Sequence, residues 1–300
     1  MIKSFHKQAK RYKLIGEWEK AKEIIQEGIN SKIASEEKAK LKVILSNILL
    51  RQAVFDKAKE LLESAEEVAK AVNDKKLLGD IYYNYGELAY INCFLREIGD
   101  YQQALEIHKK ALVIREEIND QKGITHSLSR IGVMHERLGD IETGLKFHRK
   151  ALKIVKEINY SLGGERPLIH LGADEERQGN FQKALEYYQE AMKVKDDFVD
   201  EEGQAFRLMN IGGVLYKINK DKDEHLDYLQ KGLAIAKKLD HKIAISFINY
   251  RLGMFYSEIG EKEKALEIFQ AIIEFSKPIG FIIPEKIAEA QIEKIKQKDP

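Results

Sequence analysis

Apolar residues recur at helical spacing along most of the chain. Leu128, Ile131, Met134 and Leu138 lie three or four positions apart and are separated by mostly polar residues. Such a spacing gathers apolar side chains on one face of an α-helix. Proline occurs at only four positions, 167, 278, 284 and 300, so long helices can form without interruption. The pattern therefore predicts an all-α protein built from a succession of amphipathic helices.

A short glycine motif marks the turns between neighbouring helices. Gly99-Asp100-Tyr101 recurs as Gly139-Asp140-Ile141 and as Gly179-Asn180-Phe181, each copy 40 residues after the last, and further copies begin at Gly16 and Gly260. A glycine in such a turn can adopt the left-handed backbone conformation that ends a helix. The motif predicts a repeated unit of two antiparallel helices joined by a short turn.

Small residues recur at two further positions. A glycine precedes each turn by seven residues, in Ile131-Gly132, Leu171-Gly172, Ile211-Gly212 and Leu252-Gly253, and a small residue follows the turn at Ala151, Ala191, Gly232 and Ala271. Helices pack with their axes roughly 8–10 Å apart only where the residues between them permit it. We therefore expect the glycine of one helix to face a small residue of the next.

These residues resemble the tetratricopeptide repeat family. In residues 161–200 the family pattern is matched by Leu171, Gly172, Gly179, Phe181, Ala184, Tyr188 and Ala191. The resemblance implies an α-solenoid, a right-handed superhelix of antiparallel helix pairs that stack because one pair cannot bury its apolar faces alone. The period of 40 residues is similar to that of the subclass with extended helices, which includes spindle-orientation adaptors and bacterial peptide-sensing regulators.

We divide the chain into seven units and a final helix. The units span residues 1–33, 34–73, 74–120, 121–160, 161–200, 201–240 and 241–279 of an array over 1–282, and a capping helix follows over 283–300. Pro284 suits the first turn of that helix. The lysine-rich outer face would cap the stack. An apolar stripe of Ile287, Ile292 and Ile295 could also dock back into the concave side of the array.

The third unit departs from the period. Gly86 is followed by the turn glycine, Gly99, after 13 residues instead of seven, so that six extra residues fall within 91–96. These residues are largely apolar, unlike a surface loop. Two interpretations stay open: a bulge that shapes a pocket or contacts a partner, and a longer helix that packs on its neighbour.

Charge and composition narrow the function classes. Lysine and arginine number 50 and aspartate and glutamate 49, a formal net charge of +1, with the two signs interspersed. Nucleic acid is not expected as a partner, because duplex binding needs a concentrated basic surface. The single cysteine, Cys93, excludes an intrachain disulfide and suits a reducing compartment. No apolar run reaches the roughly 18 residues of a membrane span, so we expect a cytoplasmic protein without a membrane partner.

The sequence contains no motif typical of catalysis. A nucleophile elbow, a phosphate-binding glycine loop and a zinc motif are all missing, so we expect neither an enzyme nor a cofactor or metal. His108, His135 and His148 stand where the family has core aromatic residues, and we interpret them as packed side chains. The repeated Glu136-Arg137 and Glu176-Arg177 are interpreted as surface ion pairs.

The resemblance implies that the first helix of each pair lines a concave groove. Counting from the glycine of each first helix predicts the partner-binding residues Tyr83, Asn84, Tyr90, His126, Arg130, Arg137, Arg166, His170, Arg177, Phe206, Met209, Asn210, Tyr216, Phe247, Tyr250, Arg251 and Met254, with Glu87 beside them. The groove then has an arginine-rich centre and an aromatic C-terminal half. A peptide with an apolar segment and nearby acidic residues would match it.

Three functions agree with such an array. The first is an adaptor that holds a peptide or protein segment in the groove. The second is a peptide- or ligand-sensing component of a signalling system, and the third is a self-assembling scaffold.

Overall fold

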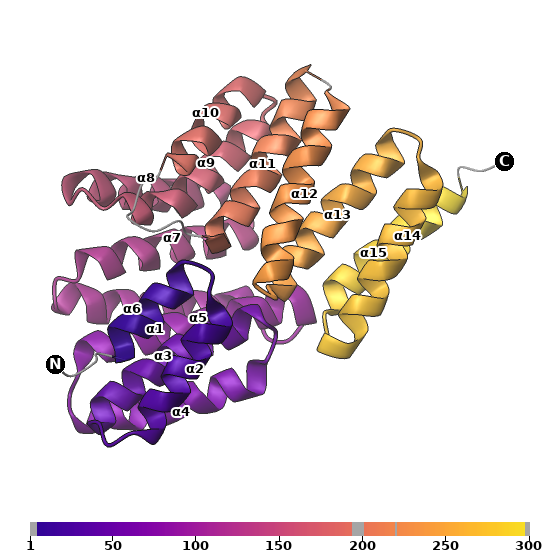
Figure 1. Cartoon of the computed structure of the whole chain (residues 1–300). Helices are drawn as coiled ribbons and strands as arrows, with labels where there is room; N and C mark the ends of the chain where they lie inside the picture. Colours follow the sequence, from indigo (N-terminus) through magenta and orange to yellow (C-terminus); the bar gives the residue numbers. More distant parts are fainter. Residues whose placement is uncertain (1–4, 194–200, 220, 298–300) are drawn as a thin grey trace.

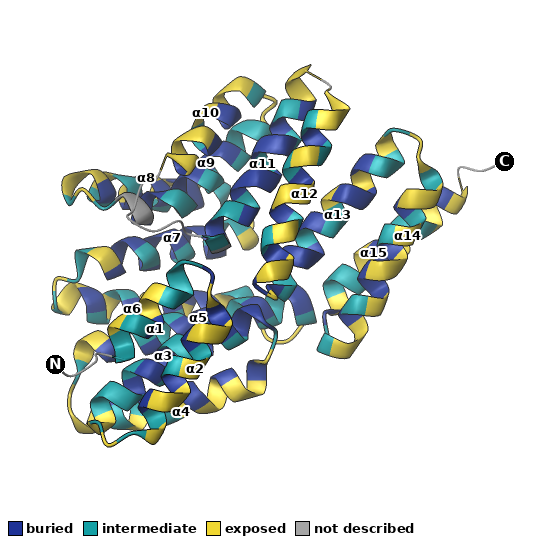
Figure 2. Ribbon diagram, viewed as in Figure 1, coloured by how far each residue is buried: buried dark blue, intermediate teal, exposed yellow. Residues whose placement is uncertain are grey.

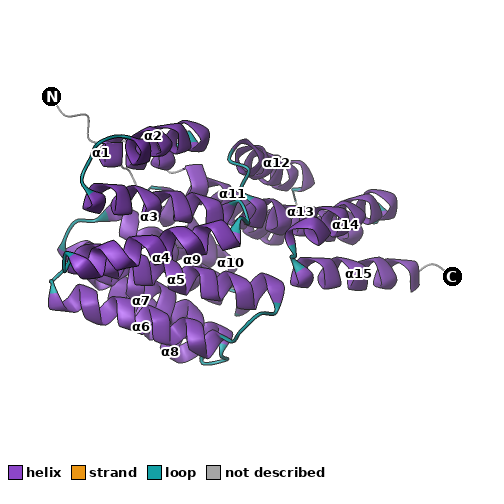
Figure 3. Ribbon diagram, turned by 90° about the horizontal axis from the view of Figure 1, so that it is seen from below, coloured by secondary structure: helices purple, strands orange, loops and turns teal. Residues whose placement is uncertain are grey.

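The computed structural model describes residues 5–193, 201–219 and 221–297, and the secondary structure of these residues is helical (Figures 1 and 3). The α-helices are α1 (Phe5–Leu14), α2 (Trp18–Asn30), α3 (Ser35–Arg51), α4 (Phe55–Ala71), α5 (Lys75–Arg96), α6 (Tyr101–Glu117), α7 (Gln121–Arg137), α8 (Ile141–Glu157), α9 (Glu165–Arg177), α10 (Phe181–Met192), α11 (Glu201–Asn219), α12 (Lys222–Lys238), α13 (Lys242–Glu258), α14 (Lys262–Ser276) and α15 (Ile282–Gln297). Two short 3-10 helices, Ser161–Gly164 and Lys277–Ile279, precede α9 and α15.

The helices form an array of antiparallel pairs, from α1 and α2 to α13 and α14, each packed against the next pair. Buried residues lie where helices face one another, and exposed residues cover the outer faces (Figure 2). The prediction of an all-α solenoid is confirmed.

The turn glycines adopt the left-handed conformation that the motif predicts. The φ angles of Gly99, Gly139 and Gly179 are +81°, +91° and +81°. The following aspartate caps the second helix in two of these turns: the backbone N–H of Gln103 donates to Asp100 over 2.6 Å, and that of Thr143 donates to Asp140 over 3.1 Å. Such a cap satisfies an amide that has no partner within the helix.

The glycine of each first helix faces a ring, not the small residue that we expected. A Cβ atom on Gly132 would lie 2.8 Å from His148, and one on Gly172 would lie 2.6 Å from Tyr188. His108, Tyr228 and Phe269 lie in the same way over Gly86, Gly212 and Gly253. His108 and His148 are both fully buried, as expected of side chains in these positions.

The extra residues of the third unit form a longer helix. Helix α5 continues without a break to Arg96 and is 22 residues long. Ile91 and Leu95 pack in one buried cluster with Phe281, the residue before α15. Phe94 stacks on Phe247 of α13, with ring centroids 5.6 Å apart. The extension therefore joins the third unit to the end of the array.

A second contact links α1 and α2, at the start of the array, to the end of the sixth pair. Leu239, after α12, is buried with Ala9 and Trp18, and the ring of Trp18 lies 5.7 Å from that of His241. Helix α15 packs on α14 through Ala288 and Ile295 and also contacts α5 and α13. The array thus closes on itself, so that units distant in sequence share buried surface.

Candidate functional site

A buried carboxylate lies at the centre of the first helices. Glu87 of α5 is 1% exposed. Its Oε2 atom forms an ion pair with Arg130 of α7 and lies 3.3 Å from Nη2 of Arg51 on α3. Burial raises the pKa of Glu87, but Arg130 and Arg51 outweigh burial and hold it at about 2. Glu87 is therefore an ionised internal anion that pairs with cations from the repeats on either side.

A third arginine reaches this centre from α9. The Nη1 atom of Arg166 donates to the Tyr83 hydroxyl over 2.9 Å. Burial lowers the pKa of Arg166, but Tyr83 and Glu87 raise it above its ordinary value. Arg51 and Arg130 thus pair with Glu87, and Arg166 adds a third guanidinium group close enough to lower the pKa of that carboxyl. Clustered guanidinium groups favour the approach of an anion.

Two uncharged contacts complete this centre. Nε2 of His126 lies 3.0 Å from the Tyr160 hydroxyl, and burial lowers the pKa of His126 to about 3, so it is neutral. Nδ2 of Asn47 donates to Oδ1 of Asn84 over 2.9 Å, and Asn84 donates in turn to the carbonyl of Asp80. The Oδ1 atom of Asn47 has no hydrogen-bond partner among the described residues.

An aromatic run continues from this centre toward α11. Tyr90 stacks on Phe94 at 5.4 Å, Phe94 on Phe247 at 5.6 Å, and Phe247 meets Phe206 edge to face at 6.4 Å. The Arg137 guanidinium lies 4.3 Å from the centre of the Phe94 ring. Phe94 belongs to the extension of the third unit. Through this residue the run connects the arginine-rich part of the predicted groove to its aromatic part.

Other residues that we assigned to the aromatic half of the groove face the core. Met209 and Tyr216 are 8% and 7% exposed. Tyr216 packs on His225 and Phe255, at 5.1 and 5.3 Å. Tyr250 packs on Phe269. Their side chains therefore offer a partner less surface than the aromatic run does.

The remaining predicted residues are spread along the array. His170 Nδ1 lies 2.8 Å from Glu136, and Arg177 donates to Asp174 over 3.1 Å. Asn210 is half-buried, whereas Arg251 and Met254 are exposed. Sequence reasoning did not assign Arg51, Asn47 or Phe94 to the site. Phe94 had a signal, because it lies among the six extra apolar residues.

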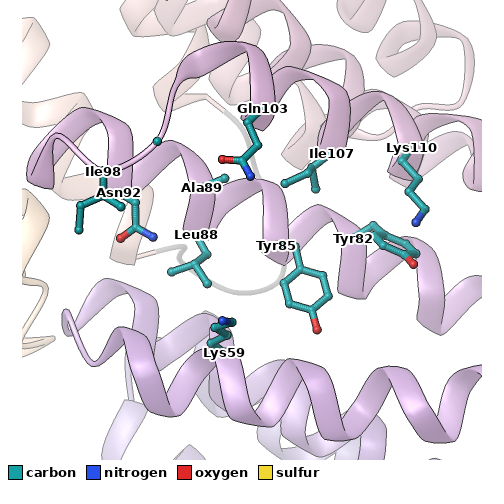
Figure 4. A pocket seen from close by; sticks show the side chains of 11 residues that line it. Lys59, Tyr82, Tyr85, Leu88, Ala89, Asn92, Ile98, Gln103, Ile107 and Lys110 are labelled. Carbon is teal, nitrogen blue, oxygen red and sulfur yellow. The ribbon is translucent and has the colours of Figure 1, made fainter.

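A pocket of about 390 Å³ lies between α4, α5 and α6, among the second helices of two units. Figure 4 shows Tyr82, Tyr85 and Leu88 of α5 between Lys59 of α4 and Lys110 of α6. The ammonium group of Lys110 covers the Tyr82 ring at 3.9 Å. This pocket does not include the residues around Glu87.

Family models for the tetratricopeptide repeat match residues 93–121, 123–197 and 248–277. Comparison with curated protein sequences gives no match. No helix in the described ranges combines the length and apolar character that a membrane span needs.

Several solved structures have a similar fold. NprR in complex with its cognate peptide NprX has a TM-score of 0.63 at 16% identity, over 95% of this chain and 81% of that chain. A Rap protein complexed with competence and sporulation factor has a TM-score of 0.63 at 13% identity, over 98% of this chain and 84% of that chain. A signal transduction ATPase with a tetratricopeptide repeat sensor, from Pyrococcus horikoshii, is matched over 90% of this chain but 41% of its own length, with a TM-score of 0.49 and 16% identity. This chain therefore spans less than half of that protein.

Proposed function

This chain belongs to the tetratricopeptide repeat family, and we propose that it is a cytoplasmic, non-catalytic module that binds a peptide or protein segment in the groove lined by α3, α5, α7 and α9. One observation carries the proposal: Arg51 and Arg130 pair with the single carboxylate of Glu87, and Arg166 lies close enough to lower the pKa of that carboxyl. A ligand carboxylate would add a second anion to this centre. Hydrogen bonds between a guanidinium group and a carboxylate are stronger than those between neutral groups.

The aromatic run indicates that the ligand has an apolar side chain beside its acidic group. Phe94 and Phe247 present ring surface beside Tyr90, within reach of an apolar side chain next to the ligand's acidic group. Aromatic and arginine side chains dominate binding energy at interfaces. NprR with NprX and the Rap protein with competence and sporulation factor have similar folds and are complexes, which supports the proposal of a peptide ligand.

The contact between α5 and α13 favours a sensor as the second candidate. Phe94 and Phe247 belong both to the aromatic run and to the closure of the array. A ligand that inserts between these rings would separate α5 from α13 and change the shape of the molecule. An adaptor predicts the same shape with and without ligand, and small-angle scattering distinguishes the two.

A screen of random displayed peptides on the whole chain tests the proposal, followed by fluorescence anisotropy with the selected peptides. We expect enrichment of aspartate or glutamate beside apolar residues, and affinity at least about tenfold weaker in Arg166→Gln, since a charged hydrogen bond contributes about 1.5–3 kcal/mol. Arg149→Gln, at an exposed position on α8, is the matched control. Selected peptides that bind both variants equally would contradict this site.

A further inference from the structure

Three metal-ligating side chains meet beside the arginine centre. Glu136 lies in the last turn of α7, His148 lies on α8 and His170 lies on α9. Oε2 of Glu136 is 2.8 Å from Nδ1 of His170, and Oε1 is 3.3 Å from Nε2 of His148. One ligand atom from each residue lies within 4.8 Å of the others. Ligands bound at roughly 2.0–2.1 Å around a tetrahedral ion lie about 3.3 Å apart, close to these separations.

The next repeat provides an internal comparison. Glu176 and Tyr188 occupy the equivalent positions 40 residues later, and the Tyr188 hydroxyl donates to Glu176 over 3.0 Å. His148 covers Gly132 as Tyr188 covers Gly172. Among the described residues, however, neither nitrogen of His148 has a hydrogen-bond partner, nor has Oε1 of Glu136. An unsatisfied buried polar group costs about 1–3 kcal/mol, and a bound cation would satisfy these atoms.

A similar histidine–carboxylate pair in the third unit also has atoms without hydrogen-bond partners among the described residues, both nitrogens of His108 and Oε1 of Glu87, but it lacks a second histidine. His108 Nε2 lies 3.8 Å from Oε1 of Glu87, and both are buried. Arg51 and Arg130 already surround that carboxylate, and their positive charge would repel a metal ion. The cluster at Glu136 therefore differs from its counterpart in having a second histidine in place of the arginines.

We propose that Glu136, His148 and His170 bind one divalent transition-metal ion, with Zn²⁺ as the best match and a fourth coordination position open. Two histidines and a glutamate are a known zinc ligand set of this kind. The rings of His148 and His170 stack with centroids 4.6 Å apart and planes at 7°, so His170 must turn about its Cβ–Cγ bond to face the same ion. The His170 side chain is 22% exposed, which gives the ion access.

Titration of the metal-free whole chain with Co²⁺ tests the proposal, because tetrahedral Co²⁺ absorbs in the visible range and Zn²⁺ should then displace it. We expect one equivalent of Co²⁺ to bind. His148→Tyr copies the next repeat, so that it removes a ligand and keeps the packing. Affinity should fall by more than about 100-fold in this variant, since loss of even an outer partner of a ligand costs 10–100-fold.

Glu136→Gln and His170→Asn should give the same loss, and circular dichroism checks that each variant folds. His135→Gln is the control, because His135 stacks on Phe147 outside the cluster. The absence of a tetrahedral spectrum in the wild-type chain would overturn the proposal. So would equal Co²⁺ affinity in a folded His148→Tyr variant, which would place the ion elsewhere on the protein.

Discussion

Phe94 stacks on Phe247 with ring planes 12° apart and centroids 5.6 Å apart, which ties the extension of α5 to α13. The two residues belong to the third and seventh pairs of the array. A solenoid in which each repeat contacts only its neighbours has no such link. The extra residues of the third unit thus change the architecture of the whole chain.

Phe94→Ala should loosen this closure. We expect a loss of about 1–3 kcal/mol in the free energy of unfolding, because the ring packs on two others and is only partly buried. Urea denaturation measures the loss, and scattering should report a larger radius of gyration. Val113→Ala, at a side chain 53% exposed, should stay within about 0.5 kcal/mol of the wild type. An unchanged radius for Phe94→Ala would show that the stack does not hold the array closed.

Glu87→Gln should destabilise the protein strongly. The substitution keeps the shape of the side chain but leaves Arg51, Arg130 and Arg166 without their common anion, and breaking a buried ion pair costs about 3–5 kcal/mol. Thermal or urea unfolding measures this loss. Glu142→Gln removes one partner of an exposed pair with Lys146, and should cost less than about 1 kcal/mol. Similar effects from both substitutions would contradict the organising role of Glu87.

Gly132→Ala and Gly213→Ala should have opposite effects. A Cβ atom on Gly132 would lie 2.8 Å from His148 and 2.9 Å from the backbone oxygen of Gly144, so two helices must separate. Nothing lies within 4 Å of such an atom on Gly213, where alanine should stabilise α11 by up to about 1 kcal/mol. We expect a loss of about 1–3 kcal/mol for Gly132→Ala. Melting temperatures that move in the same direction would count against the close packing of α7 on α8.

Stability should fall as the pH drops below 6.5. Burial lowers the pKa of His108 and His126 to about 3 and that of His170 to about 4, from the ordinary 6.5. The unfolded chain therefore binds protons between pH 6.5 and about 4 that the folded chain does not. Each histidine contributes a slope of up to about 1.4 kcal/mol per pH unit, and this stability is fully present above pH 6.5.

Urea denaturation across this pH range, in the presence of a chelator, measures that slope. His126→Gln should reduce it, because the variant removes one of the three buried groups that gain a proton on unfolding. A free energy of unfolding that does not change between pH 6.5 and 4.5 would mean that these histidines are already protonated in the fold.

Local pattern was enough to predict the helices and their turns. The motif at Gly99 and Gly139 depends on backbone conformation within a few residues, so sequence spacing reveals it directly. The proximity of Tyr83, Arg130 and Arg166 could also be predicted, because these residues follow the register of the first helices. These contacts recur at equivalent positions of neighbouring units, so the period of the repeat predicts them.

Contacts that do not follow the period of the repeat could not be predicted from the sequence in this way. The side chain of Tyr216 has the spacing of a groove residue but packs on His225 and Phe255, because local packing decides which side of a helix a large ring takes. Phe94 meets Phe247 through the curvature of the whole array. Glu136 and Glu176 occupy equivalent positions and are each followed by an arginine. Glu136 lies against His148 and His170, whereas Glu176 accepts a hydrogen bond from Tyr188. This difference arises from the packing of neighbouring helices.

The burial of Phe281 has a consequence for how the chain folds. This residue lies just before the last helix, is fully buried, and packs with Phe55 and Leu50 of the second pair. Repeat arrays ordinarily fray from their ends, one unit at a time. Here the final helix and an early pair protect the same apolar surface, so neither end can open alone. The chain should therefore unfold in one cooperative transition, and removal of α15 should increase amide hydrogen exchange in α4.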